Sequence, residues 1–184
     1  MNVYDFDKTI YRGDSTIDFY LFSLKQKPLL MCCLPIQAWG FVLYFFGKID
    51  KTKLKEKFFC FIKNIDCEQY VDAFWAKNKR KMADWYIEQQ KSDDVVISAS
   101  PDFLLQPICE QLGIQHLMAS CVDPKTGKFL GDNCYGIAKV ERYKTAFGNS
   151  RIDHFYSDSL SDTPMAQLAD NAFLVTKKEI TKWG

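Results

Sequence analysis

The 184-residue sequence predicts an α/β protein: a parallel sheet with a helical domain inserted after its first strand. Three observations lead to this fold class. Residues 3–6 form a short run of strand length, and from residue 93 onward apolar runs of strand length alternate with helical segments. Between these two parts, residues 15–90 are aromatic-rich, poor in Gly and helical in pattern. Strands that alternate with helices pair in parallel, so the first strand should join the later ones.

The elements of the sheet can be predicted one by one. Strands are expected at residues 3–6, 95–98, 114–119, 154–157 and 173–175. Ser100 as N-cap and Pro101 at the first position predict a helix that ends at Gly113. Two more helices are expected at residues 137–147 and 161–169, and a hairpin turn at residues 124–127.

The placement of these elements divides the chain into two predicted domains. Residues 1–14 and 91–184 form the α/β core, and residues 15–90 form the helical domain, with breaks between helices at residues 48–50 and 64–66. Functional groups of parallel sheets gather at the carboxyl ends of the strands.

Composition narrows the classes of function. The formal net charge of +1 gives no electrostatic case for a nucleic-acid partner. Lys53, Lys55 and Lys57 are interpreted as a solvated helix face. The 7 cysteines show no metal-ligand spacing and predict reduced thiols, and the 2 histidines lie in different segments. Acidic residues occupy the place of a secretory signal core, so a cytoplasmic location is expected.

Two carboxylates open the chemical motif of the chain. Asp5 and Asp7 lie two residues apart, at the end of the first strand, so the turn that follows can direct both toward one substrate. A carboxylate can attack phosphorus, and a neighbouring carboxylic acid can protonate the leaving oxygen. A pair of acids that only caps a turn is the alternative interpretation.

Further polar residues follow the later strands. Ser98 ends the second strand, and the backbone N–H groups of Ala99 and Ser100 could complete an anion cradle with its hydroxyl. Lys139 lies near the start of a predicted helix and could stabilise phosphoryl charge. Asp158 and Asp162 follow the fourth strand, where oxygen ligands suit Mg²⁺.

In its order of motifs the chain resembles the haloacid dehalogenase (HAD) superfamily, along essentially its whole length. The resemblance implies a Rossmann-like core with a C1-type cap, as in the phosphoserine phosphatase-like subfamily IB. It implies Asp5 as nucleophile, Asp7 as general acid/base, and Ser98 and Lys139 as phosphate ligands, with Ser100 as a second choice for the hydroxyl. Asp5, Asp158 and the backbone carbonyl of Asp7 would hold Mg²⁺, with Asp162 as the supporting acid and Thr9 steadying the first loop.

An acid at the position of Asp7 implies phosphate-ester hydrolysis rather than dehalogenation or ion pumping, and a phosphotransferase uses the same residues. Asp14 falls where phosphoserine phosphatases place an acid that faces the substrate ammonium. Residues 53–61 contain no Arg to bind a substrate carboxylate, which speaks against phosphoserine. Asp14 as the N-cap of the first cap helix is the equal alternative.

Residues 29–46 carry no charge and are long enough for a membrane-span candidate. A single crossing would separate Asp5 from the later motifs, so either a buried helix pair or a segment dipping into one leaflet remains. With a segment that dips into one leaflet, the chain resembles bacterial phosphatidylglycerophosphate phosphatases. Peripheral membrane contact at the inner membrane face is then expected. A soluble phosphorylated metabolite is the expected substrate, a lipid phosphate the alternative, and a non-catalytic binding module a further one. The oligomeric state stays open.

Overall fold

The computed structural model describes residues 1–184, and its strands form one six-stranded sheet. The strand order is β3-β2-β1-β4-β5-β6, and all neighbours pair in parallel except the antiparallel pair β5 and β6. The strands are β1 (Asn2–Tyr4), β2 (Val95–Pro101), β3 (His116–Ser120), β4 (Ile152–Ser157), β5 (Ala169–Val175) and β6 (Ile180–Lys182). The predicted parallel α/β fold is therefore confirmed.

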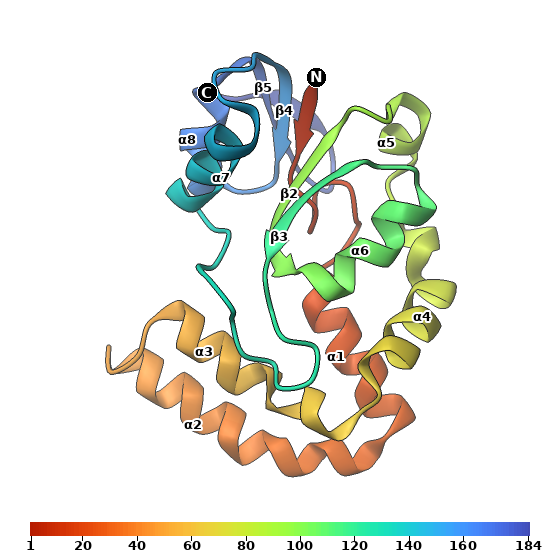
Figure 1. The fold of residues 1–184 in the computed structure, drawn as a ribbon, viewed down its shortest axis with the longest axis vertical. Helices are drawn as coiled ribbons and strands as arrows, with labels where there is room; N and C mark the ends of the chain where they lie inside the picture. The colour runs from red at the N-terminus through yellow and green to blue at the C-terminus, as the bar shows by residue number, and fades with distance from the viewer.

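Helices cover the sheet and fill the insertion between β1 and β2. The core helices are α6 (Asp102–Gln111), α7 (Ile137–Phe147), η4 (Leu160–Asp162) and α8 (Thr163–Ala166). The inserted ones are α1 (Ser15–Gln26), η1 (Pro28–Cys33), α2 (Leu34–Phe45), α3 (Lys51–Phe58), η2 (Phe59–Asn64), α4 (Cys67–Asn78), η3 (Lys79–Lys81) and α5 (Asp84–Gln89). Figure 1 shows α2 and α3 at the opposite end of the molecule from both chain termini.

Alternation of apolar residues along the strands builds a core on each face of the sheet. Val3 and Val95 belong to a cluster of 10 buried residues on one face. Tyr4 and Val96, their neighbours in sequence, belong to a cluster of 26 on the other face. The larger cluster also takes in Phe74 of α4, so part of the insertion shares one core with the sheet.

A loop of the core reaches down to the inserted helices (Figure 1). The turn predicted at residues 124–127 is present, because the N–H of Gly127 donates to the carbonyl of Asp123 at 2.8 Å. Gly127 has φ +69 and lies so close to Phe59 that a Cβ would meet the Phe59 carbonyl oxygen at 2.6 Å. The flanking strands of the predicted hairpin are reduced to one bridge between Val122 and Phe129.

The structure departs from the sequence predictions at the start of α6 and at the last strand. The helix expected to start with Ser100 as N-cap begins instead at Asp102, because β2 continues to Pro101, which pairs with Ser120 of β3. Strand β6 was not predicted, because it is short and exposed at the sheet edge. All seven cysteines are free, as expected from their spacing.

Candidate active site

The strand order brings the predicted site residues together. Strand β1 lies between β2 and β4, so the residue after β1 is flanked by residues at the carboxyl ends of both neighbours. Asp5 follows β1, Ser98 lies near the end of β2, and Asp158 follows β4. The N–H of Asp5 donates to the carbonyl of Tyr156 at 2.8 Å, which extends the β1–β4 ladder by one residue. Three segments far apart in sequence thus meet at one edge of the sheet.

A buried ion network centres on Lys139. Its ammonium lies 2.6 Å from Oδ1 of Asp5 and 2.7 Å from Oδ2 of Asp162, and all three side chains are almost fully buried. Ser157 also donates to Oδ2 of Asp162, at 2.7 Å. Burial by itself lowers the pKa of Lys139, but the attraction of both carboxylates raises it above its usual value. Lys139 is therefore a fixed cation beside Asp5.

Opposing electrostatic effects act on the pKa of the Asp5 carboxyl. Burial raises its pKa to about 7, while the Lys139 ammonium acts in the lowering direction and Asp162 in the raising one. A strongly shifted acid in a pocket beside a specific charge partner is typical of a functional site.

Asp7 is held by two hydrogen bonds from other segments. The N–H of Ser15 donates to Oδ1 at 2.5 Å, and the Ser100 hydroxyl donates to Oδ2 at 2.5 Å. Burial and the nearby Asp14 raise the pKa of Asp7 to about 6, against the lowering effect of these two donors. A carboxyl with a pKa close to neutral is suited to giving and taking a proton.

The chain turns sharply just after these acids. Lys8 has φ 57, the left-handed region that residues other than Gly seldom adopt, and its N–H donates to the carbonyl of Gly13 at 2.8 Å. Thr9 is buried, and its N–H donates to the carbonyl of Phe6 at 3.3 Å. The Thr9 hydroxyl has no hydrogen-bond partner. The turn directs Asp5, Asp7 and Lys8 into one pocket.

The two serines predicted as alternatives have separate positions. Ser98 and Ala99 line the same pocket as Asp5. Ser100 does not line that pocket, because its hydroxyl bonds Asp7 and its N–H donates to Oγ of Ser98 at 3.1 Å. The geometry thus favours Ser98 as the hydroxyl that faces a phosphate, and gives Ser100 the task of holding Asp7.

Lys55 corrects one sequence interpretation. It was predicted on a solvated helix face, but its ammonium reaches from α3 to the carbonyl of Ala99 at 2.8 Å and to Oδ1 of Asn133 at 3.0 Å. Burial and the like charge of Lys51 lower the pKa of Lys55 to about 8. The prediction failed because helix periodicity does not show which face another domain will cover.

Asp14 is the N-cap of α1, where its carboxylate accepts from the N–H of Ile17 at 3.0 Å. This is one of the two roles expected from the sequence. Asp14 is absent from the lining of the pocket that holds Asp5.

The pocket at the carboxylates has a volume of about 180 Å³. Its lining includes Asp5, Asp7 and Asp158, which were predicted to be catalytic or metal-ligating. It also includes three predicted phosphate ligands and the predicted supporting acid: Ser98, Ala99, Lys139 and Asp162. Tyr135, Ser159 and Ser161 also line it and were not singled out from the sequence. The two serines flank Leu160 in the same acidic loop, so their position in that motif was an available signal.

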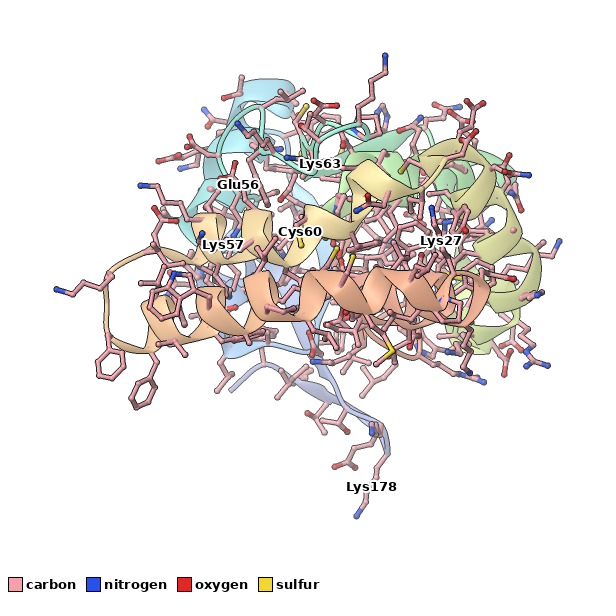
Figure 2. The ribbon with its side chains drawn as sticks, turned by 90° about the horizontal axis from the view of Figure 1, so that it is seen from below. Lys27, Glu56, Lys57, Cys60, Lys63 and Lys178 are labelled. Carbon is pink, nitrogen blue, oxygen red and sulfur yellow. The ribbon has the colours of Figure 1, made fainter.

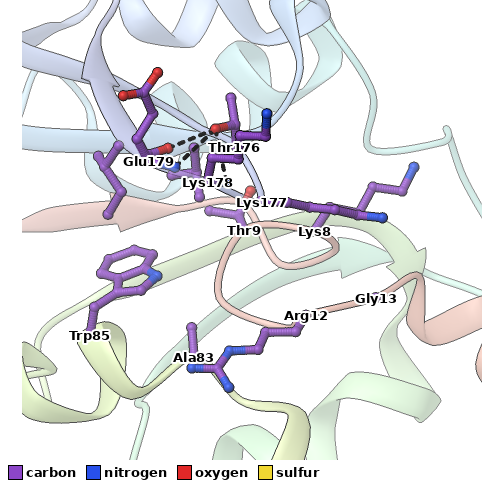
Figure 3. A pocket seen from close by; sticks show the side chains of 12 residues that line it. Lys8, Thr9, Arg12, Gly13, Ala83, Trp85, Thr176, Lys177, Lys178 and Glu179 are labelled. Carbon is purple, nitrogen blue, oxygen red and sulfur yellow. Dashed lines mark hydrogen bonds between the residues drawn. The ribbon is translucent and has the colours of Figure 1, made fainter.

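A larger cavity of about 580 Å³ lies behind the first loop, and Figure 3 shows its lining. Lys8 and Thr9 face it from the loop, Trp85 from α5, and Lys177 from the turn between β5 and β6. It contains none of the site carboxylates, so we assign the candidate active site to the smaller pocket.

The donors at the pocket suit a hard divalent cation. Asp158 is half-buried at the pocket wall, and burial raises its pKa while the nearby Lys8 acts to lower it. No group of three or more His, Cys, Asp or Glu side chains converges as a ready-made metal cage. Mg²⁺ needs no such cage, because it keeps several waters and uses one or two carboxylates together with substrate phosphate. Asp5, Asp158 and the backbone carbonyl of Asp7 fit that requirement.

Comparison with known proteins identifies the class of this fold and site. The family model of the haloacid dehalogenase-like hydrolases matches residues 3–167. The chain therefore belongs to the haloacid dehalogenase-like hydrolase family, as its motif order had indicated. Among curated proteins, it is 36% identical over 90 residues to a protein of Mycobacterium tuberculosis named a probable phosphatase. That match covers 45% of this chain and 31% of the relative, so the chain matches less than half the length of this curated protein.

Two solved structures show how far the fold is shared. A protein of unknown function from Bordetella pertussis Tohama I superposes with a TM-score of 0.76 at 17% identity, over 94% of this chain and 87% of the other. A substrate-bound phosphoserine phosphatase gives a TM-score of 0.55 at 18% identity, over 92% and 82% of the two chains. At these identities the likeness concerns the fold, including the inserted helices.

Proposed function

We propose that this protein is a Mg²⁺-dependent phosphatase that hydrolyses a phosphate monoester through an aspartyl-phosphate on Asp5. The observation that carries the proposal is the buried contact of Asp5 with Lys139 in a pocket that also holds Asp7, Ser98 and Asp158. Family membership and the probable phosphatase among the relatives support the same chemistry.

In the first step, an oxygen of the Asp5 carboxylate attacks phosphorus and the bond from phosphorus to the ester oxygen breaks. Protonated Asp7 gives its proton to the departing alcohol oxygen. Lys139 and the Ser98 hydroxyl stabilise the charge on the phosphoryl oxygens. Mg²⁺, when bound, supplies further positive charge next to the nucleophile and the phosphate.

In the second step, the Asp7 carboxylate takes a proton from a water molecule, and the water oxygen attacks the phosphorus of the aspartyl-phosphate. The bond from phosphorus to the Asp5 oxygen breaks, which releases inorganic phosphate and restores the carboxylate. The two donors on Asp7, from Ser15 and Ser100, keep its carboxyl facing the reaction centre through both steps. An alcohol in place of the water would make the protein a phosphotransferase.

We infer that residues 15–90 serve as the cap over this site, on the core formed by residues 1–14 and 91–184. The contact of Lys55 with Ala99 supports this division for α3, because it brings the inserted helices to the edge of the pocket. A cap excludes water and selects the substrate.

A small phosphorylated metabolite is the substrate we favour, since the pocket has a volume of only about 180 Å³. A lipid phosphate is the second candidate, and one observation favours it: η1 and α2 of the cap expose a large apolar surface. Phosphoserine is disfavoured, because α3 offers Lys55 and no Arg beside the site.

The test is phosphate release from a panel of soluble phosphomonoesters, amino-alcohol phosphates and phosphatidylglycerophosphate, with Mg²⁺ and with EDTA. We expect release that depends on Mg²⁺, and the best substrate then separates a metabolite from a lipid. Folded protein that releases no phosphate from any of them would contradict the proposal in this form and favour a non-catalytic binding module.

A further inference from the structure

Helix α2 has its polar and small residues inside and its large apolar residues outside. Gln37 and Gly40 are its buried positions, and Cys33, the residue just before α2, is buried at the spacing of the same narrow helix face. The outward residues of η1, α2 and the turn after α2 form what we call the α2 surface: Leu29, Met31, Leu34, Ile36, Trp39, Phe41, Val42, Tyr44, Phe45 and Phe46. Phe45 is 84% exposed and Leu29 77%. Apolar areas of this kind on a soluble domain mark an interaction site.

The helix is held firmly in this orientation. The Gln37 side chain accepts from the Tyr20 hydroxyl at 2.7 Å and donates to the carbonyl of Phe58 at 2.9 Å. Gly40 lies so close to α3 that a Cβ would meet Cβ of Lys57 at 3.0 Å. Rotation of α2 to bury its apolar side would break these contacts, so the α2 surface is a fixed feature of the fold.

Charge is distributed unevenly around this surface. Residues 19–49 contain three lysines and no acidic residue. Residues 19–63 contain eight lysines, of which Lys55 alone is bonded to the core at Ala99, and two acidic residues, a net charge of +6, whereas the whole chain carries +1. The rest of the molecule is therefore net negative by five charges. Figure 2 shows α2 across the outer face of the cap, with Lys27 and Lys57 beside it.

We propose that the α2 surface docks the protein onto an anionic lipid membrane. Aromatic side chains enter the interface between headgroups and acyl chains, and the surrounding lysines meet the lipid phosphates. The apolar residues surround most of the helix, whereas a groove on a protein partner would cover one side of it. A shallow hollow at the end of α2, lined by Phe41, Phe45 and Phe46 among its seven residues, adds apolar area at the tip.

The geometry is that of a segment that docks onto one side of a membrane and does not cross it. The segment Pro28–Phe45 is long and apolar enough to span a membrane by length and composition, and 22% of it is buried. However, Asp5 before it and Lys139 after it form an ion pair, so both ends of the segment belong to one side. Helix α3 packs on α2 and reaches the edge of the pocket through Lys55, so the active site lies on the side of α3 that faces away from the lipid.

The docking surface goes beyond the proposed phosphatase and does not require it, so the two can be tested apart. Sedimentation with phosphatidylcholine vesicles, with and without phosphatidylglycerol, measures binding for the wild type and for Asp5→Asn. Both proteins should bind the anionic vesicles more tightly than the neutral ones, and added salt should weaken binding.

The paired variant carries both Trp39→Gln and Phe45→Gln on the α2 surface. Its control is the single variant Ile87→Gln, on α5 of the same insertion, where Ile87 is 43% exposed. We expect the first pair to lower the partition coefficient at least about tenfold, equivalent to about 1.4 kcal/mol. Ile87→Gln should leave it unchanged. Hydrolysis of a soluble phosphoester and the circular dichroism spectrum check that each variant is folded.

A second readout uses the position of Trp39. Vesicles with brominated acyl chains should quench part of the wild-type tryptophan fluorescence, and Trp39→Phe should lose that part. Wild type that fails to sediment with anionic vesicles overturns the proposal, and so does equal binding by the paired variant. A dimer in solution that the paired variant converts to a monomer would assign the α2 surface to a second copy of the chain instead.

Discussion

Lys139 links the two buried carboxylates of the site, Asp5 and Asp162, at 2.6 and 2.7 Å. Each carboxylate depends on this cation, because an unpaired buried charge loses several kcal/mol of solvation. We therefore expect the network to contribute to folding and, under the proposed mechanism, to catalysis, and substitution can separate the two contributions.

Lys139→Met should lower the free energy of unfolding by about 3–5 kcal/mol, since it leaves two buried acids without a cation. Phosphate release should be lost as well. Adding Asp162→Asn should recover part of the stability and none of the activity. Urea denaturation at pH 7 measures the first effect. Lys144→Met, on the exposed side of the same helix, is the control, and an equal effect of both substitutions would contradict the account.

At the residue scale the sequence was most informative where a motif stands at a strand end. The convergence of Asp5, Asp7 and Asp158 on one pocket could be predicted because each lies at or just after the end of a predicted strand, although β1 ends at Tyr4 and not at residue 6. Ser98 and Ser100 could not be separated, since they lie two residues apart near the end of β2 and only the fold shows that Ser100 bonds Asp7. The roles given to these residues stay proposals until they are tested.

At the scale of single elements, helix α3 joins the cap to the core through Lys55. Its ammonium bonds Ala99 and Asn133, and burial lowers its pKa to about 8 from the ordinary 10.5. Between these two pH values the unfolded chain keeps a proton on Lys55 that the folded chain releases. Stability from this group therefore rises with pH across that window, and at pH 7 the buried charge is a penalty.

Lys55→Met should leave the unfolding midpoint at pH 7 unchanged or higher, because it removes a buried charge. The Ser120 hydroxyl, 3.0 Å from the Ala99 carbonyl and 3.1 Å from Oδ1 of Asn133, can still donate its one hydrogen to either acceptor. Any difference by which the unfolding midpoint of Lys55→Met exceeds that of the wild type should shrink as the pH approaches 10.5. The KM for substrate should rise, since a cation beside the pocket is lost. Thermal unfolding measures the midpoint and steady-state kinetics measure the KM. Lys53→Met, at an exposed lysine of the same helix, is the control. Clear destabilisation at pH 7 would count against the account.

The elements themselves were predictable to different degrees. Helix α7 has the predicted bounds, because Gly136 and Gly148 delimit a clear amphipathic pattern. Strand β6 was not predicted, and the strands of the hairpin were predicted to be longer than they are. Both elements depend on pairing partners that no local pattern identifies. The outward orientation of α2 could not be predicted either, because it depends on Gln37 meeting Tyr20 and Phe58.

At the scale of the whole molecule, cap and core share one apolar cluster. Phe74 of α4 contacts Phe19 of α1 and Trp75, whose indole donates to the carbonyl of Leu104 in α6 at 2.6 Å. Tyr4 of β1 belongs to the same cluster of 26 buried residues. The parts of the molecule should therefore unfold together.

Phe74→Ala should lower the free energy of unfolding by about 3–5 kcal/mol and still give one cooperative transition. Urea denaturation followed by circular dichroism and by tryptophan fluorescence should give coincident curves. Phe45→Ala, at an exposed phenylalanine of the cap, should change stability by less than about 0.5 kcal/mol. Two separate transitions would show that the cap folds on its own and would refute the shared core.

The proposal that Asp5 is the nucleophile is tested most directly by phosphate release from Asp5→Asn, compared with Asp94→Asn. Asp94 is also a buried acid, but it lies at the opposite end of β2 and bonds the N–H of Lys91 at 2.8 Å. We predict that Asp5→Asn, folded by circular dichroism, loses activity by about 10⁴-fold or more, while Asp94→Asn stays within a few-fold of the wild type. Turnover by Asp5→Asn near the wild-type rate would contradict the covalent mechanism.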